Sequence, residues 1–162
     1  LTQERLKELL RYDPDTGIFT RAKTVGRCDR WKAGDAVGHL AKNGYIQIWA
    51  DGKLHQAHRL AWLYVFGHWP KSLLDHKDGK RNHNAINNIR EGSDKLNMQN
   101  IRKAHVDNKS GLLGVKEYRA GSFLARIFVS GKEKHLGCFP TAQEAHEAYL
   151  MEKRKVHEFC TI

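Results

Sequence analysis

The chain has 162 residues, of which 40% are hydrophobic and 28% charged, and its formal net charge is +10 at pH 7. This length and composition allow a packed core, in one ordinary domain or two small ones, and argue against wholesale disorder. The longest apolar run, residues 60–66, is much shorter than the roughly 20 residues of a membrane span, so we expect no membrane partner.

The net charge indicates which class of partner the protein binds, and the cysteines indicate the cellular compartment. A basic surface attracts polyanions such as nucleic acid or anionic lipid, and here the basic residues are spread over the whole chain. The three cysteines lie far apart without a CxxC pair, which argues against a cysteine zinc site and against a disulfide scaffold. Residues 1–11 lack the apolar stretch of a secretory signal. We therefore expect a cytoplasmic protein.

The first 57 residues predict a helix and a hairpin. Thr2 can cap a helix that runs to Arg11, and a turn at residues 12–17 leads into a short strand at 18–20. Residues 45–49 alternate as a strand does, and Asp51-Gly52 is a hairpin turn into a strand at 53–57. Between these strands lies a Gly-rich stretch, 21–44, whose cations either contact a nucleic-acid backbone or are simply solvated: Arg21, Lys23, Arg27, Arg30 and Lys32.

A helix expected at residues 58–66 ends at Gly67, and a polar segment follows. Asp75 and His76 come directly after two leucines, where a strand would end. A carboxylate that holds a hard divalent cation and a neutral imidazole that takes a proton from water are the groups of metal-assisted phosphodiester hydrolysis. Strict alternation would send the two side chains to opposite faces, so we expect the strand to twist or end there.

This segment resembles the HNH endonuclease family, in particular its phage and homing-endonuclease branch. The resemblance rests on ordered spacing over some forty residues, in which the family keeps two strands and a helix around one metal ion, the ββα-metal arrangement. The resembling motifs are His58-Arg59-Leu60, Asp75-His76-x-Asp78-Gly79, Asn84, Asn88-Ile89-Arg90, Asn97 and Asn100.

The resemblance implies a role for individual residues. Asp75 resembles the first metal ligand, His76 the general base, Asn88 the residue that orients the base through a hydrogen bond, and Asn97 the second metal ligand. Two oxygen donors suit one Mg²⁺ or Mn²⁺ ion per active site better than Zn²⁺. The family reaction leaves 5′-phosphate and 3′-hydroxyl ends. Arg59 either approaches a phosphate or supports the buried helix.

Three short strand patterns, at residues 114–118, 123–129 and 132–139, precede a helix that begins with the capping box Thr141-Ala142-Gln143-Glu144. Residues 108–159 resemble the Apetala-type, ethylene-response-factor-like DNA-binding domain. In that domain one face of the sheet enters the major groove and the other packs on the helix. The resembling motifs are Gly114-Val115, Ala125-x-Ile127, His135-Leu136-Gly137-x-Phe139 and Thr141-Ala142-x-Glu144-Ala145-x-x-Ala148-Tyr149.

The period of two along a strand predicts which residues share a face of this sheet. Apolar residues at 115, 125, 127 and 136 should meet the helix, and the opposite face should carry cations that neutralise phosphates or reach guanine. The alternative is a unit that only stabilises the nuclease. Alternation leaves open whether Lys134 or His135 lies on that opposite face. The residues expected to contact DNA are Lys116, Tyr118, Arg119, Arg126, Lys134 and His135.

We therefore predict an α+β chain of two parts. Residues 1–104 form an HNH nuclease domain, with an N-terminal α/β extension and a ββα-metal core at about 54–103, and residues 108–162 form a three-stranded sheet packed on one helix. The predicted function is metal-dependent cleavage of double-stranded DNA, by a monomer or a homodimer, in the host cytoplasm if a phage encodes the chain. One alternative is a DNA-binding regulator that keeps the nuclease fold without catalysis. A zinc-stabilised module is disfavoured, because no Cys/His quartet has ligand spacing.

Overall fold

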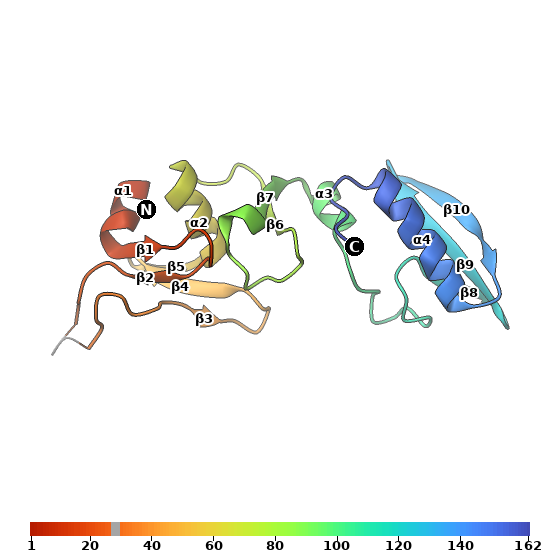
Figure 1. Cartoon of the computed structure of the whole chain (residues 1–162), viewed down its shortest axis with the longest axis horizontal. Coiled ribbons are helices and arrows are strands. Elements are labelled where there is room, and N and C mark those ends of the chain that lie inside the picture. The colour runs from red at the N-terminus through yellow and green to blue at the C-terminus, as the bar shows by residue number, and fades with distance from the viewer. Residues whose placement is uncertain (27–29) are drawn as a thin grey trace. The chain divides into compact units, whose positions relative to one another are not determined.

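The computed structural model describes residues 1–26 and 30–162, which fold as two compact units, Leu1–Ser93 and Asp94–Ile162 (Figure 1). The division falls before the expected boundary at 104–108, so the short helix α3 (Asp94–Gln99) belongs to the second unit. Arg27 of the basic loop and Cys28 lie outside the described residues. Within the described ranges, no helix is both long enough and apolar enough to cross a membrane.

The first unit is a mixed α/β arrangement of short elements around one core. The hairpin expected at 45–57 is present as β4 and β5, which form a three-stranded sheet with β3 in the order β3-β4-β5. Its elements are α1 (Gln3–Leu9), β1 (Leu10–Tyr12), β2 (Phe19–Arg21), β3 (His39–Leu40), β4 (Ile46–Ala50), β5 (Lys53–Gln56), α2 (Ala57–Phe66), β6 (Leu73–His76) and β7 (Ile89–Gly92).

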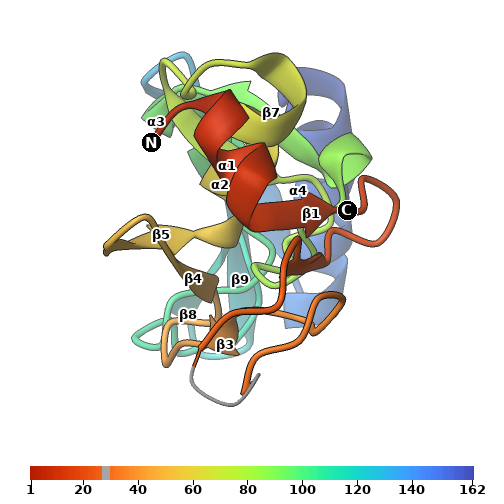
Figure 2. The same ribbon diagram turned by 90° about the vertical axis from the view of Figure 1, so that its left-hand side faces the viewer.

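Helix α1 is shorter than predicted. Thr2 caps it as expected, through its side-chain oxygen and the Arg5 N–H, but the helix ends at Leu9 and the chain continues without a break as β1 (Figure 2). Leu10 and Tyr12 are buried while Arg11 between them is exposed, which is the alternation of a strand. Pairing with β2 therefore prevails over the helical period in this segment.

The core of the first unit lies where α1 and α2 meet the sheet β3-β4-β5. Leu6 of α1 and Leu60 of α2 are fully buried there, beside Phe19 and Ile48. Gly67 ends α2 in the left-handed conformation, with φ of +78°, as the sequence predicted. Ile89 of β7 belongs to this core and Leu74 of β6 packs against it, so the core supports the strands that follow α2.

Strands β6 and β7 form a separate antiparallel pair, joined by a polar loop and a 3₁₀ turn, Ile86–Asn88. The strand expected to end at Asp75-His76 is present, since β6 stops at His76. Ile89 begins β7 directly after this turn.

The second unit contains α3 and a three-stranded antiparallel sheet in the order β10-β9-β8, with α4 along one face (Figure 1). Thr141 caps α4 through its hydroxyl oxygen, which accepts from the Glu144 N–H. Val115, Ala125 and Ala145 form the buried centre between sheet and helix, as the period of two predicted. The bounds are β8 (Val115–Arg119), β9 (Ser122–Val129), β10 (Lys132–Phe139) and α4 (Ala142–Val156).

Candidate active site

The β6–β7 hairpin presents Asp75 and His76 on its two faces. In the antiparallel register Asp75 lies opposite Arg90 and His76 opposite Ile89. His76 is only 4% exposed, whereas Asp75 is partly buried. Because β6 ends at His76, both side chains stand at the end of the strand, as the sequence predicted.

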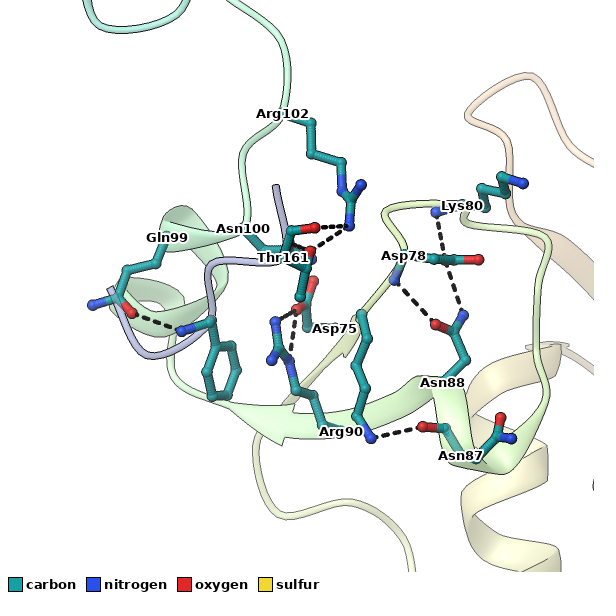
Figure 3. Close-up of polar contacts among 12 residues, drawn as sticks. Asp75, Asp78, Lys80, Asn87, Asn88, Arg90, Gln99, Asn100, Arg102 and Thr161 are labelled. Carbon is teal, nitrogen blue, oxygen red and sulfur yellow. Dashed lines mark hydrogen bonds and ion pairs between the residues drawn. The ribbon is translucent and has the colours of Figure 1, made fainter. Parts of the chain in front are cut away.

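Asp75 is held by the side chain of Arg90 (Figure 3). The Nε and Nη2 atoms of Arg90 both donate to Oδ2 of Asp75, at 3.0 and 2.8 Å. A charge-assisted pair of this kind fixes the orientation of a carboxylate. Arg90 belongs to the motif Asn88-Ile89-Arg90, but nothing in that motif indicated a contact with Asp75.

His76 is held by Asn84. The His76 Nε2 atom lies 3.1 Å from Asn84 Oδ1, and Asn84 is 2% exposed. The Asn84 Nδ2 atom donates to the Asn82 carbonyl at 3.4 Å, which orients the amide so that Oδ1 faces the imidazole. An amide oxygen can only accept, so Nε2 carries the hydrogen and Nδ1 is the basic nitrogen of His76.

The N-terminal turn supports the Asn84 backbone. The Tyr12 hydroxyl donates to the Asn84 carbonyl at 2.7 Å, and the Ile86 N–H donates to the Pro14 carbonyl at 3.0 Å. Gly17, with φ of +75°, packs so closely that a Cβ there would lie 2.2 Å from the Asn84 carbonyl carbon. The N-terminal extension therefore positions the residue that holds His76.

Two aromatic rings, the buried His58 and the half-buried Tyr45, lie beside His76. The His58 ring lies edge-on at 5.1 Å between centroids, and the Tyr45 ring lies at 6.0 Å. Burial lowers the pKa of His76, while the hydrogen bond with Asn84 acts to raise it. Burial, with smaller contributions from the nearby His76 and Arg59, lowers the pKa of His58 to about 3. His76 is therefore neutral at neutral pH, the state a general base requires.

Asn88 does not make the hydrogen bond expected of it. Its Oδ1 accepts from the Asp78 N–H at 3.0 Å, and its Nδ2 donates to Asp78 Oδ1 at 3.0 Å (Figure 3). The same Nδ2 donates to the His83 carbonyl at 2.8 Å. The expected contact with His76 is made by Asn84 instead. Asn88 thus closes the loop that carries Asn84 and is linked to His76 through that loop.

The same loop contains a His–Asp pair. His83 Nδ1 lies 2.6 Å from Asp78 Oδ2, and the Lys80 N–H donates to the other oxygen at 2.8 Å. Burial acts to raise the pKa of Asp78, but the hydrogen bonds from His83, Lys80 and Asn88 lower it to about 2. Asp78 is therefore ionised over the whole physiological range, and it organises the loop.

Asn97 lies on α3, in the second unit. Its Oδ1 atom is buried and has no hydrogen-bond partner among the described residues. A buried amide oxygen without a partner costs free energy, so such an atom usually marks a ligand or an ordered water. Among the described residues, no three His, Cys, Asp or Glu side chains gather as a metal-binding group.

The outer face of the C-terminal sheet carries part of the expected DNA-contacting set. Lys116 pairs across the sheet with Leu124, and His135 with Arg126, all on the face away from α4. Arg126 forms an ion pair with Glu133 at 3.1 Å. Tyr118 is exposed, and the Arg119 guanidinium lies 5.2 Å from the centre of its ring. This face combines cations with aromatic surface.

Of the two alternatives for that face, the structure places His135 on it and Lys134 on the opposite face. Lys134 pairs across the sheet with the buried Ile127, and its Nζ forms a 2.8 Å ion pair with Glu152 of α4. It therefore belongs to the helix-packed face, because cross-strand partners share a face. Arg59, the remaining expected contact, lies on α2 with its guanidinium 5.8 Å from the centre of the Trp69 ring.

A family model described as HNH endonuclease matches residues 55–99, the segment that carries Asp75, His76, Asn84, Asn88 and Asn97. Residues 55–99 are an HNH endonuclease domain. The prediction of an HNH-type nuclease is confirmed at this level. The Apetala-type assignment of residues 108–159 stays a prediction.

Two comparisons extend beyond the HNH domain. Over 131 residues the chain is 28% identical to DNA endonuclease I-HmuI of Bacillus phage SP01, an alignment that covers 77% of this chain and 74% of that protein. A solved structure described as DNA binding and cleavage by the HNH homing endonuclease I-HmuI aligns with a TM-score of 0.43 at 20% identity, covering 93% of this chain and 88% of the other.

Proposed function

We propose that this chain is a metal-dependent DNA endonuclease that hydrolyses phosphodiester bonds to 5′-phosphate and 3′-hydroxyl ends. The observation that carries the proposal is the buried His76, held by Asn84, at the end of the strand that also presents Asp75. The HNH domain and the sequence relative named as a DNA endonuclease support nuclease chemistry on DNA.

His76 acts as the general base. Its Nε2 donates to Asn84, so the proton of the attacking water is taken up at Nδ1. The lowered pKa keeps the ring neutral before the reaction, and the amide oxygen stabilises the imidazolium that forms. Asn88 supports this arrangement by holding the Asp78–His83 loop.

Asp75 and Asn97 are the proposed ligands of one Mg²⁺ or Mn²⁺ ion. The residues fit such an ion, because Asp75 supplies a carboxylate and Asn97 a buried amide oxygen without a partner. Arg90 holds the Asp75 carboxylate through Oδ2. A bound ion of this kind stabilises the charge that develops on the phosphate and the leaving oxygen.

Double-stranded DNA is the proposed partner, held by the nuclease domain and by the outer face of an Apetala-type unit. Cations on that face neutralise phosphates, and Tyr118 adds aromatic surface. Lys134 is excluded, because Glu152 pairs with it on the helix side. The contacts we propose are Arg59, Lys116, Tyr118, Arg119, Arg126 and His135.

Cleavage of supercoiled plasmid tests the proposal. We expect the wild-type protein to convert plasmid to open-circular or linear form with Mg²⁺ or Mn²⁺ and not with EDTA. His76→Ala should reduce the rate by about 10²-fold or more, the usual contribution of a general base. His68→Ala, which alters an exposed histidine, is the matched control and should cleave like wild type.

Two further readouts separate the alternatives. Labelling of the product ends with polynucleotide kinase should require prior phosphatase treatment if the 5′ ends carry phosphate. A protein that shifts plasmid in a gel but leaves it intact with Mg²⁺, Mn²⁺, Ca²⁺ and Zn²⁺ would be a DNA-binding regulator, and the proposal would fail.

A further inference from the structure

A buried lysine lies against the segment that follows α3. Lys153 of α4 is 1% exposed, and its Nζ donates to the Ile101 carbonyl at 2.5 Å, with the Tyr149 ring centre 5.8 Å away. Burial lowers the pKa of this lysine, so placing its amine there costs free energy. The hydrogen bond to Ile101 and the contact with the Tyr149 ring offset part of that cost and hold the lysine against this segment.

Segment 157–162 holds the same region by three further contacts. The Phe159 N–H donates to the Gln99 side-chain oxygen at 3.2 Å. The Thr161 hydroxyl donates to Asn100 Oδ1 at 2.6 Å and accepts from the Arg102 guanidinium (Figure 3). Four consecutive residues, 99–102, are therefore tied to α4 and to segment 157–162.

These contacts begin two residues after Asn97. Helix α3 has six residues, far fewer than the 12 to 15 at which an isolated helix becomes marginally stable. The Asn100 N–H donates to the Asn97 carbonyl at 3.1 Å, which links the held segment to the backbone of Asn97 itself. The position of the Asn97 side chain thus depends on contacts made within the second unit.

We propose that Lys153, Phe159 and Thr161 are positioning residues for Asn97. The inference rests on the proposed function, in which Asn97 is a metal ligand. Replacing a residue that holds a metal ligand in place, without contacting the metal itself, typically lowers metal affinity by about 10- to 100-fold.

Metal binding without turnover tests the inference. In a His76→Ala background, Mn²⁺ is titrated and the free ion is followed by electron paramagnetic resonance, with duplex DNA present. Lys153→Met removes the charge at similar size, and Thr161→Val removes the hydroxyl at the same shape. We expect each to weaken Mn²⁺ binding by about 10-fold or more, while DNA affinity in EDTA stays at the parent value.

Matched variants serve as controls. Lys155→Met changes an exposed lysine of the same helix turn, and Thr161→Ser keeps the hydroxyl, so both should bind Mn²⁺ like the parent. The inference is overturned if Thr161→Val and Lys153→Met bind Mn²⁺ like the parent, or if Thr161→Ser weakens binding as much as Thr161→Val. Circular dichroism checks folding, and if Lys153→Met is unfolded the Thr161 pair decides.

Asn97→Ala separates this inference from the proposed function. If Asn97→Ala binds Mn²⁺ as tightly as the parent, the ligand assignment itself fails. If Asn97→Ala weakens binding while the Lys153 and Thr161 variants do not, only the positioning role fails.

Discussion

Four asparagines follow His76 within a dozen residues, and they make different hydrogen bonds. The Asn84 side chain accepts from the imidazole, whereas the Asn88 amide donates to Asp78 and to the His83 carbonyl. The sequence identified the pair Asp75-His76 but could not distinguish the asparagines, because the path of the loop decides which amide reaches the ring. An N-terminal turn, distant in sequence, sets that path.

Replacing Asn84 should disturb the tautomer of His76. We expect Asn84→Leu to lower kcat by roughly 10²-fold, because the ring loses the acceptor that keeps the hydrogen on Nε2. Asn84→Asp keeps an acceptor and should retain more activity. Long-range ¹H–¹⁵N spectra of the imidazoles check the tautomer directly, and Asn87→Ala, an exposed neighbour, is the control. An unchanged Nε2–H signal in Asn84→Leu would contradict the assignment.

His58 should make the stability of the first unit depend on pH. Its pKa is about 3 in the folded protein against an ordinary 6.5, so the unfolded chain binds the proton more readily. Stability is therefore complete above pH 6.5 and falls as the pH drops from 6.5 towards 3, by about 1.4 kcal/mol per unit.

Urea unfolding at pH 6.5 and pH 5 measures this effect. All four tryptophans lie in the first unit, so their fluorescence reports its unfolding. In wild type the free energy of unfolding should be lower at pH 5 than at pH 6.5, and His58→Phe should reduce this difference by about 2 kcal/mol. His68→Phe, at an exposed position, should leave the difference as it is in wild type.

Among the elements, the turn of residues 13–17 connects the N-terminal extension to the site. Gly17→Ala should destabilise the first unit and lower cleavage, because a methyl group there would displace the Asn84 backbone. Gly52→Ala is the matched control, since Gly52 has the same φ of +75° but no atom within 4 Å of its Cβ position.

Both glycine variants carry the backbone strain of a positive φ, about 1–3 kcal/mol. Gly17→Ala should cost more than Gly52→Ala in urea unfolding, and it alone should slow plasmid cleavage under conditions where both variants are folded. Equal costs and equal cleavage rates would show that the close packing at Gly17 has no influence on the site.

Elements with strong local signals were predictable. The capping box of α4, the glycine that ends α2, and the end of β6 all follow from side-chain chemistry within a few residues. Strand β1 was not predictable, because its Leu10 also continues the helical period of α1 and only pairing with β2 decides. A shift in register between His135 and Gly137 shows why sequence alternation left Lys134 and His135 unresolved.

At the scale of the whole molecule, the charge of +10 should appear as salt-dependent DNA binding. Lys116→Ala removes a cation from the outer face of the sheet and should weaken binding while reducing the slope of log affinity against log salt by about 1. Lys134→Ala should leave the slope unchanged, because Glu152 already pairs with that lysine. Fluorescence anisotropy over a salt series checks both, and equal slopes for the two variants would contradict the assigned faces.

The placement of α3 bears on how such a protein could be recombined with others. The resemblances suggest a junction after residue 104, yet a chimera joined there would separate α3 from Lys153, Phe159 and Thr161. A junction at Ser93 transfers the helix together with its partners. A chimera that exchanges the second unit at Ser93 would therefore carry Asn97, the proposed metal ligand, along with it.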